Sequence, residues 1–210
     1  MYKTNFFSKL TIAAIFTIII YRVAQIGCRI YDVIVLKHFM NETGNYANRL
    51  KFMTNEFKIE HATGNIVIIA WFISFSLWLF ASYKQVQATS ENFFSYKPAA
   101  ALFSLIIPVF NLFAPYKIMN EIWTEQNRDA LEEKSGLDLI NTWWFFGIAV
   151  FIYSKYCNYK FEHARGAEEL LKVEYHKIIY YAVSIHYFIL LKKLMTLVDG
   201  EQNYSLQKWQ

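Results

Sequence analysis

The apolar residues of this 210-residue chain are gathered into long blocks that polar segments separate. An α-helix rises 1.5 Å per residue, so about 20 apolar residues cross a hydrocarbon core of about 30 Å. Only 18% of the residues are charged, whereas soluble domains average about 25%. Such blocks exclude the amphipathic patterning of a soluble domain. They predict an all-α fold, a polytopic membrane helical bundle that forms one integral membrane domain over residues 1–210.

The blocks predict about five transmembrane helices. The first begins near Phe6 or Leu10, and the others cover Ile66 to about Tyr83, Pro98 to Met119, Leu139 to about Cys157, and Ile178 to Leu191 or Val198. The fifth is the shortest, because the fourteen residues between Lys177 and Lys192 give about 21 Å of helix. It crosses only if Lys192 and Lys193 snorkel or face protein. Otherwise four helices cross and the fifth is re-entrant or interfacial.

Three polar segments lie between these helices. Residues Lys37 to Asn65 are mixed in character and predict a connection. Residues Thr124 to Asp138 predict a short acidic surface helix that ends at Gly136. Between Tyr159 and His176, four glutamates are interspersed with lysine and arginine, which predicts a solvated helical face.

The first helix carries four polar residues, Arg22, Gln25, Arg29 and Asp32, at spacings i, i+3, i+7 and i+10. These spacings put all four on one helical face. Only twelve residues separate Arg22 from the preceding lysine, about 18 Å of helix, so the helix must continue and Arg22 lies below the membrane surface. One interpretation is an internal polar seam, in which Asp32 pairs with Arg29. In the other, the helix leaves the bilayer near Gly27 and the four residues face lipid head groups.

The third predicted helix is interrupted by Pro108, Asn111 and Pro115. Proline donates no backbone hydrogen bond, so Pro108 frees the carbonyl of Ser104 and Pro115 frees that of Asn111. Freed carbonyls need other partners in lipid, and we expect a kinked helix here. A kink opens room between helices where a ligand could sit. In the other interpretation, the prolines only serve the packing of this helix and no ligand binds there.

One histidine, His186, lies inside the fifth predicted helix. A lone histidine in a membrane helix more often forms a hydrogen bond between helices than a proton relay. With the polar face of the first helix and the expected kink, it gives a candidate intramembrane polar cluster: Arg22, Gln25, Arg29, Asp32, Asn111 and His186.

Motifs that carry catalysis or hold a cofactor are absent from the sequence. Glu121 and Glu125 are spaced i, i+4, but two carboxylates without a third ligand make a weak metal site. The two cysteines, Cys28 and Cys157, are expected to be buried and inert. We therefore expect no catalytic residue, no cofactor and no metal. The net charge of +4 comes from basic residues beside apolar segments, which predicts contact with lipid head groups and not with nucleic acid.

A motif with regular spacing covers the third predicted helix. It reads Pro-x9-Pro-x2-Asn-x3-Pro-Tyr-x2-Met-x-Glu-x-Trp, and its members are Pro98, Pro108, Asn111, Pro115, Tyr116, Met119, Glu121 and Trp123, with Trp143 and Trp144 opening the next predicted helix. Here the chain resembles the bacterial membrane proteins grouped as the domain-of-unknown-function 4328 family, over roughly residues 60–200. That family often has an arginine and an asparagine where this chain has Ala81 or Ser82 and Gln85. The resemblance implies a multi-pass helical membrane protein and supplies no reaction.

These observations predict a non-enzymatic accessory, scaffold or small-ligand-binding subunit. The expected location is the bacterial inner membrane, and the expected partners are the lipid bilayer and other membrane proteins or a second copy of the chain. The alternative is a small transporter or channel with a polar path near the kinked helix, lined by Arg22, Arg29, Asn111 and His186. An intramembrane enzyme ranks lowest, because the sequence shows no nucleophile–base pair or metal set.

Overall fold

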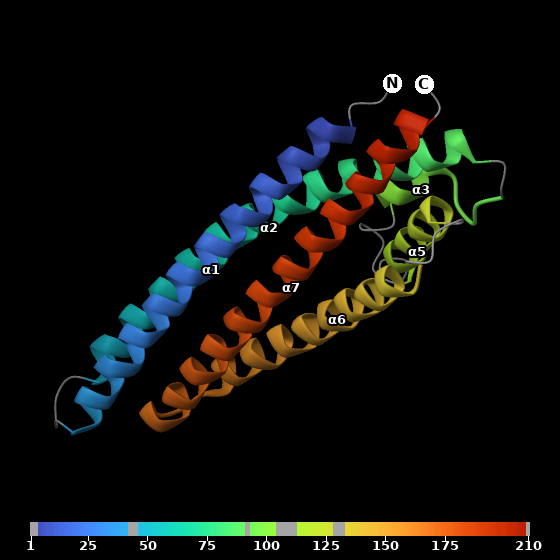
Figure 1. The fold of residues 1–210 in the computed structure, drawn as a ribbon. Coiled ribbons are helices and arrows are strands. Elements are labelled where there is room, and N and C mark those ends of the chain that lie inside the picture. Colours follow the sequence, from blue (N-terminus) through green and yellow to red (C-terminus); the bar gives the residue numbers. More distant parts are fainter. Residues whose placement is uncertain (1–3, 42–45, 91–92, 104–112, 128–132, 209–210) are drawn as a thin grey trace. The chain divides into compact units, whose positions relative to one another are not determined.

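The computed structural model describes residues 4–41, 46–90, 93–103, 113–127 and 133–208. Its elements are α1 (Thr4–Asn41), α2 (Tyr46–Thr89), α3 (Pro98–Phe103), α5 (Ala114–Gln126), α6 (Glu133–His163) and α7 (Ala167–Lys208) (Figure 1). Every one of these elements is a helix, and the described ranges contain no strand. The predicted all-α fold is therefore confirmed.

Four helices within the described residues are long and apolar enough to cross a membrane. They are Asn5–His38 in α1, Ala62–Thr89 in α2, Gly136–His163 in α6 and Ala167–Gly200 in α7. These four contain the first, second, fourth and fifth predicted spans. The fifth is long enough because α7 continues past the lysines on both sides. Lys177 is buried, Lys192 is half-buried and Lys193 is exposed, so the condition that both Lys192 and Lys193 snorkel or face protein stays a prediction. The third predicted span lies partly outside the described residues, so the count of five helices stays a prediction.

The predicted kink lies largely within residues 104–112, which the structure does not describe. Pro108 and Asn111 lie outside the described residues. Pro115 lies in the first turn of α5, whose N-cap is Phe113. The first N–H groups of a helix have no partner within it, so a proline there costs no hydrogen bond. Pro115 therefore starts α5 and does not interrupt it, and the kink itself stays a prediction.

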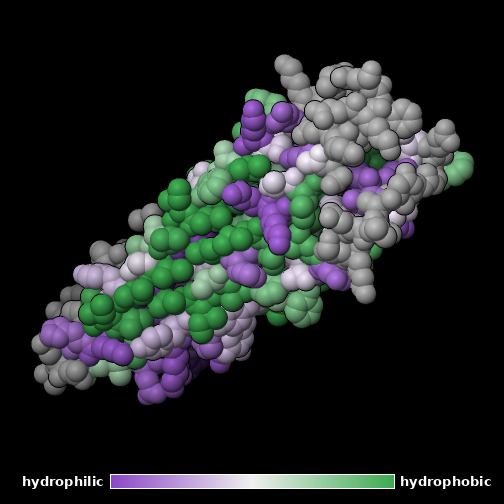
Figure 2. Space-filling view, in the orientation of Figure 1, coloured by the Kyte–Doolittle hydropathy of each residue, from purple (hydrophilic) through white to green (hydrophobic). Residues whose placement is uncertain are grey.

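The long helices expose many large apolar side chains. Ile20 on α1 is 69% exposed, and Phe145 on α6 is 72% exposed. Figure 2 shows hydrophobic side chains, in green, gathered along the helices on the visible face. Apolar surface left in water costs about 25 cal/mol per Å², whereas hydrocarbon accepts it. Length, composition and exposed apolar surface thus agree on a membrane protein.

Contacts divide the chain into two compact units, and α1, α2, α6 and α7 each contribute to both. Unit 1 comprises Met1–Ile15, Ala70–Phe146 and Ile189–Gln210, and unit 2 comprises Phe16–Ile69 and Gly147–Phe188. That the whole chain forms one domain stays a prediction.

Unit 1 has an aromatic core. The Phe75 and Trp78 rings stack with centroids 5.7 Å apart, and the Trp143 ring of α6 lies 6.2 Å from Phe75. Thr11 of α1 donates a hydrogen bond of 2.9 Å to the backbone carbonyl of Ser74. All five side chains are buried. Aromatic pairs of this kind add about 0.5–1.5 kcal/mol beyond the burial of their surface.

Unit 2 combines a small apolar cluster with a polar interior. Leu36 of α1 packs on Leu170 of α7, with Phe161, Ala164 and Leu171 around them. The rest of the buried face of α1 in this unit is mainly polar, and it forms the candidate site described below.

The connections differ from the prediction. Because α1 runs to Asn41 and α2 begins at Tyr46, most of the segment predicted as a connection between Lys37 and Asn65 is helical. Lysine, arginine and glutamate in this segment favour helix, and a helix need not end where the bilayer does. The expectation that Gly136 ends a helix is wrong, since it lies in the first turn of α6. There it packs on the indole of Trp123, where a larger residue would not fit.

Candidate functional site

The polar face of α1 lies in the interior of unit 2. Arg22, Gln25, Arg29 and Asp32 are all buried, none more than 6% exposed. The helix is continuous through Gly27, so the 3- and 4-residue spacings keep the four side chains on one face. This is the arrangement of an internal polar seam.

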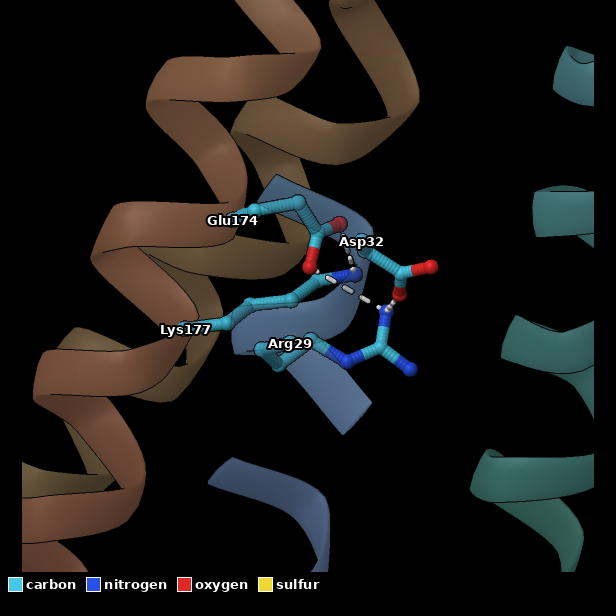
Figure 3. Close-up of polar contacts among 4 residues, drawn as sticks. All are labelled: Arg29, Asp32, Glu174 and Lys177. Atoms are coloured by element: carbon cyan, nitrogen blue, oxygen red, sulfur yellow. Dashed lines mark hydrogen bonds and ion pairs between the residues drawn. The ribbon is translucent and has the colours of Figure 1, made fainter. Parts of the chain in front are cut away.

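Arg29 and Asp32 form a four-charge cluster with Glu174 and Lys177 of α7 (Figure 3). Arg29 Nη1 lies 3.1 Å from Asp32 Oδ2 and 3.1 Å from Glu174 Oε2. The other Glu174 oxygen, Oε1, accepts a hydrogen bond of 3.2 Å from Lys177 Nζ. Lys177 Nζ also lies 4.2 Å from the centroid of the Phe161 ring. Two cations and two carboxylates make this cluster neutral, and each charge has a partner that offsets the cost of burial.

Arg22 is held differently, by neutral groups. Its Nη1 donates to Gln25 Oε1 at 2.7 Å, and its Nη2 donates to the Tyr180 hydroxyl at 3.4 Å. The guanidinium carbon lies 5.3 Å from the Tyr180 ring centroid and 5.1 Å from that of Tyr181. Its Nε is buried and has no hydrogen-bond partner in the described part of the chain. Burying a charged group among neutral partners is unfavourable.

A cavity of about 350 Å³ opens beside Arg22 within unit 2. Polar side chains of four helices line it, among them Arg22 and Gln25 of α1, Asn65 of α2, Asn158 of α6, and Lys177 and Tyr180 of α7. Binding pockets for small molecules fall in the range of about 300–1,000 Å³ and carry a few convergent polar groups. This cavity has both properties.

Two further polar groupings lie in unit 1. Asp199 of α7 accepts hydrogen bonds from Ser8 of α1 and from Trp78 Nε1 of α2, the latter at 3.1 Å. Glu121 of α5 accepts from the Tyr83 hydroxyl and, at 3.3 Å, from the backbone N–H of Ser95. These contacts tie unit 1 together.

The motif that carried the family resemblance contributes to the same unit. Met119 and Trp123 are buried in α5, and Trp143 is buried in α6. The Tyr116 hydroxyl donates to Asn141 Oδ1 at 2.7 Å. These motif positions are therefore structural contacts of unit 1, not members of the cavity.

The predicted polar cluster is only partly assembled among the described residues. Asn111 lies outside them, and His186 is exposed on α7 and does not line the cavity. The prediction missed Glu174, Lys177 and Tyr180. Their spacing of i, i+3 and i+6 on α7 was the available signal, but the charged residues around them pointed to a solvated face. That expectation is wrong at Glu174, whose side chain is fully buried opposite Arg29.

No group of three His, Cys, Asp or Glu side chains suited to a metal occurs among the residues that the structure describes. His176 shares a hydrogen bond of 2.9 Å with Tyr153. Cys157 is buried as expected, whereas the same expectation is wrong for Cys28, which is exposed. Cys28 precedes Arg29 by one position, and one residue turns a helix by about 100°, away from the buried face.

A family model described as a domain of unknown function, DUF4328, matches residues 60–199. The chain belongs to the DUF4328 family. The resemblance predicted over roughly residues 60–200 is thus confirmed. No protein with a curated description and no solved structure matches the chain. The match includes Glu174, Lys177 and Tyr180, whereas Arg22 and Arg29 precede it. The cavity of this DUF4328 chain is therefore lined by α2, α6 and α7 inside the family region and by α1 outside it.

Proposed function

We propose that this DUF4328 chain is a non-enzymatic membrane protein that binds a small ligand in the unit 2 cavity. The observation that carries the proposal is the cavity of about 350 Å³ into which polar side chains of α1, α2, α6 and α7 converge. Buried polar groups need hydrogen-bond partners. In this lining Arg22 Nε is buried and has no partner among the described residues, and a ligand in the cavity would supply one. The amides, hydroxyls and cations in the lining are groups that bind and orient a ligand.

A cavity-filling variant tests the proposal. Ser154 of α6 lines the cavity, and Ser154→Trp would occupy much of it. Thr142→Trp on the same helix is the matched control, because Thr142 is exposed and does not line the cavity. The thermal unfolding midpoint of detergent-purified protein is measured with four probes: inorganic phosphate, acetate, choline and glucose.

At least one probe is expected to raise the midpoint of the wild type and of Thr142→Trp but not that of Ser154→Trp, because a ligand that binds the native state stabilises it. If neither these probes nor an anionic lipid separates the two variants, the cavity is not a binding site. Steady turnover of a lipid or peptide substrate by the purified protein would overturn the non-enzymatic part of the proposal.

The alternative, a small transporter or channel, stays a prediction. Its path depends on the segment around Pro108 and Asn111, which lies outside the described residues. His186, which was expected to line the path, is exposed on α7.

A further inference from the structure

Among the side chains that the structure describes, the buried charges of the unit 2 polar interior do not balance. Arg29, Lys177, Asp32 and Glu174 form the neutral four-charge cluster. Arg22 is the fifth buried charge among the described side chains of this interior, and its contacts with Gln25, Tyr180 and Tyr181 are with neutral groups. The described part of this interior therefore carries one excess positive charge. A buried charge without a counter-charge is unfavourable.

The cavity presents this excess charge to whatever occupies it. Three of the side chains that line it are cationic, Arg22, Lys155 and Lys177, and none of its described lining residues is Asp or Glu. Arg22 is 94% buried, and its Nε still has no hydrogen-bond partner among the described residues. A guanidinium binds carboxylate or phosphate oxygens through short, charge-assisted hydrogen bonds, often two at once.

If the cavity binds a ligand as proposed above, its chemistry follows from this lining. We propose that the ligand is an anion whose carboxylate or phosphate group binds Arg22. Gln25 and Tyr180 hold the guanidinium in place from either side, since Nη1 bonds the amide oxygen and Nη2 the phenol oxygen. The amide groups of Asn65 and Asn158 line the same space and can donate to the remaining oxygens of the anion.

Two sources can supply such a group: a small soluble anion, or the head group of an anionic lipid. The volume of about 350 Å³ accepts either a small anion or a lipid phosphate with its glycerol. Two measurements distinguish the sources. A small soluble anion is detected when inorganic phosphate or acetate raises the unfolding midpoint of detergent-purified protein. A lipid head group is detected when native mass spectrometry shows phosphatidylglycerol adducts on the protein.

The sharpest test uses Gln25→Glu. Gln25 Oε1 already accepts a hydrogen bond of 2.7 Å from Arg22 Nη1, so glutamate of the same shape would provide the missing negative charge inside the protein. We expect Gln25→Glu to raise the unfolding midpoint of the ligand-free protein and to reduce anion affinity at least tenfold. Gln85→Glu adds the same charge in unit 1, away from the cavity, and should leave anion affinity unchanged.

Arg22→Gln provides the complementary test, with Arg165→Gln as its control, because Arg165 is exposed and outside the cavity. Arg22→Gln should reduce the anion affinity at least tenfold, and Arg165→Gln should leave it unchanged. If Arg22→Gln does not fold, the Gln25→Glu and Gln85→Glu pair still decides the question.

Equal anion affinity in Gln25→Glu and Gln85→Glu would overturn the inference. The two proposals can fail separately. If choline or glucose binds, and Ser154→Trp abolishes that binding while phosphate, acetate and phosphatidylglycerol do not bind, the cavity is a ligand site but not an anion site. If no probe and no lipid distinguishes Ser154→Trp from Thr142→Trp, both proposals are wrong.

Discussion

Arg29 of α1 and Glu174 of α7 form an ion pair of 3.1 Å, although 145 positions separate them in the sequence and neither side chain is more than 5% exposed. The same guanidinium nitrogen contacts Asp32, and the second Glu174 oxygen contacts Lys177. The pair therefore links two ion pairs within single helices into one cluster that joins α1 to α7 in unit 2.

Removing the shared carboxylate should destabilise the protein strongly. Glu174→Gln takes away the negative charge that both Arg29 and Lys177 contact. Deleting one partner of a buried ion pair costs about 3–5 kcal/mol, because the remaining charge stays buried. We expect a loss of about that size in the free energy of unfolding, measured by denaturant titration in detergent.

The control is Glu168→Gln. Glu168 forms an ion pair of 2.8 Å with Lys172 on the same helix, but both side chains are largely exposed. Exposed pairs contribute little to stability, because water and salt screen them, so we expect only a small loss in Glu168→Gln. Similar losses in the two variants would contradict a stabilising role for the buried cluster.

That Arg22, Gln25, Arg29 and Asp32 share one helical face, and that Arg22 lies below the membrane surface, could be predicted from helical spacing and membrane thickness. Whether this face lies inside the protein or against lipid head groups was left open by the sequence, and the structure buries it. The role of Glu174 could not be predicted. Residues 162–177 carry so many charges that local pattern indicates solvent, and only the packing of α7 on α1 shows which glutamate meets Arg29. Spacing assigns a residue to a face of its own helix, but the partner of that face is set by tertiary packing.

The carboxylate of Asp199 should contribute to the stability of unit 1. It accepts hydrogen bonds from Ser8 and from Trp78, whose indole is fully buried. Asp199→Ala would leave the Trp78 N–H without this acceptor, and an unsatisfied buried group costs about 1–3 kcal/mol. Asp199→Asn keeps a carbonyl oxygen for Trp78 and should cost less. Unfolding followed by tryptophan fluorescence measures both.

Thr196→Ala serves as the control for this prediction. The Thr196 side chain is exposed, and among the described residues its hydroxyl bonds only the backbone carbonyl of Lys192 on the same helix. If Thr196→Ala lowers the free energy of unfolding as much as Asp199→Ala does, the Asp199 hydrogen bonds are not the cause of the loss.

The close approach of Gly136 to Trp123 predicts that any larger residue at this position destabilises unit 1. A Cβ at Gly136 would overlap the Trp123 indole, which is itself buried. Overpacking of this kind typically costs about 1–3 kcal/mol, so Gly136→Ala should lower the unfolding midpoint, and adding Trp123→Phe should recover part of the loss. Gly200→Ala is the comparison, because nothing lies within 4 Å of a Cβ there. Equal midpoints for the two alanine variants would contradict the steric explanation.

The hydroxyl of Tyr83 should contribute more than that of Tyr116, although both donate a hydrogen bond within unit 1. Tyr83 is fully buried and bonds Glu121, and its oxygen also accepts from the Tyr96 N–H at 3.4 Å. Tyr116 bonds the exposed side chain of Asn141. Water can replace an exposed partner but not a buried one, whose loss costs about 1–3 kcal/mol. Tyr83→Phe should therefore lower the free energy of unfolding by about 1–3 kcal/mol and Tyr116→Phe by clearly less, in denaturant titrations run side by side. If the order is reversed, the Tyr83–Glu121 contact is not what holds α5 against α2.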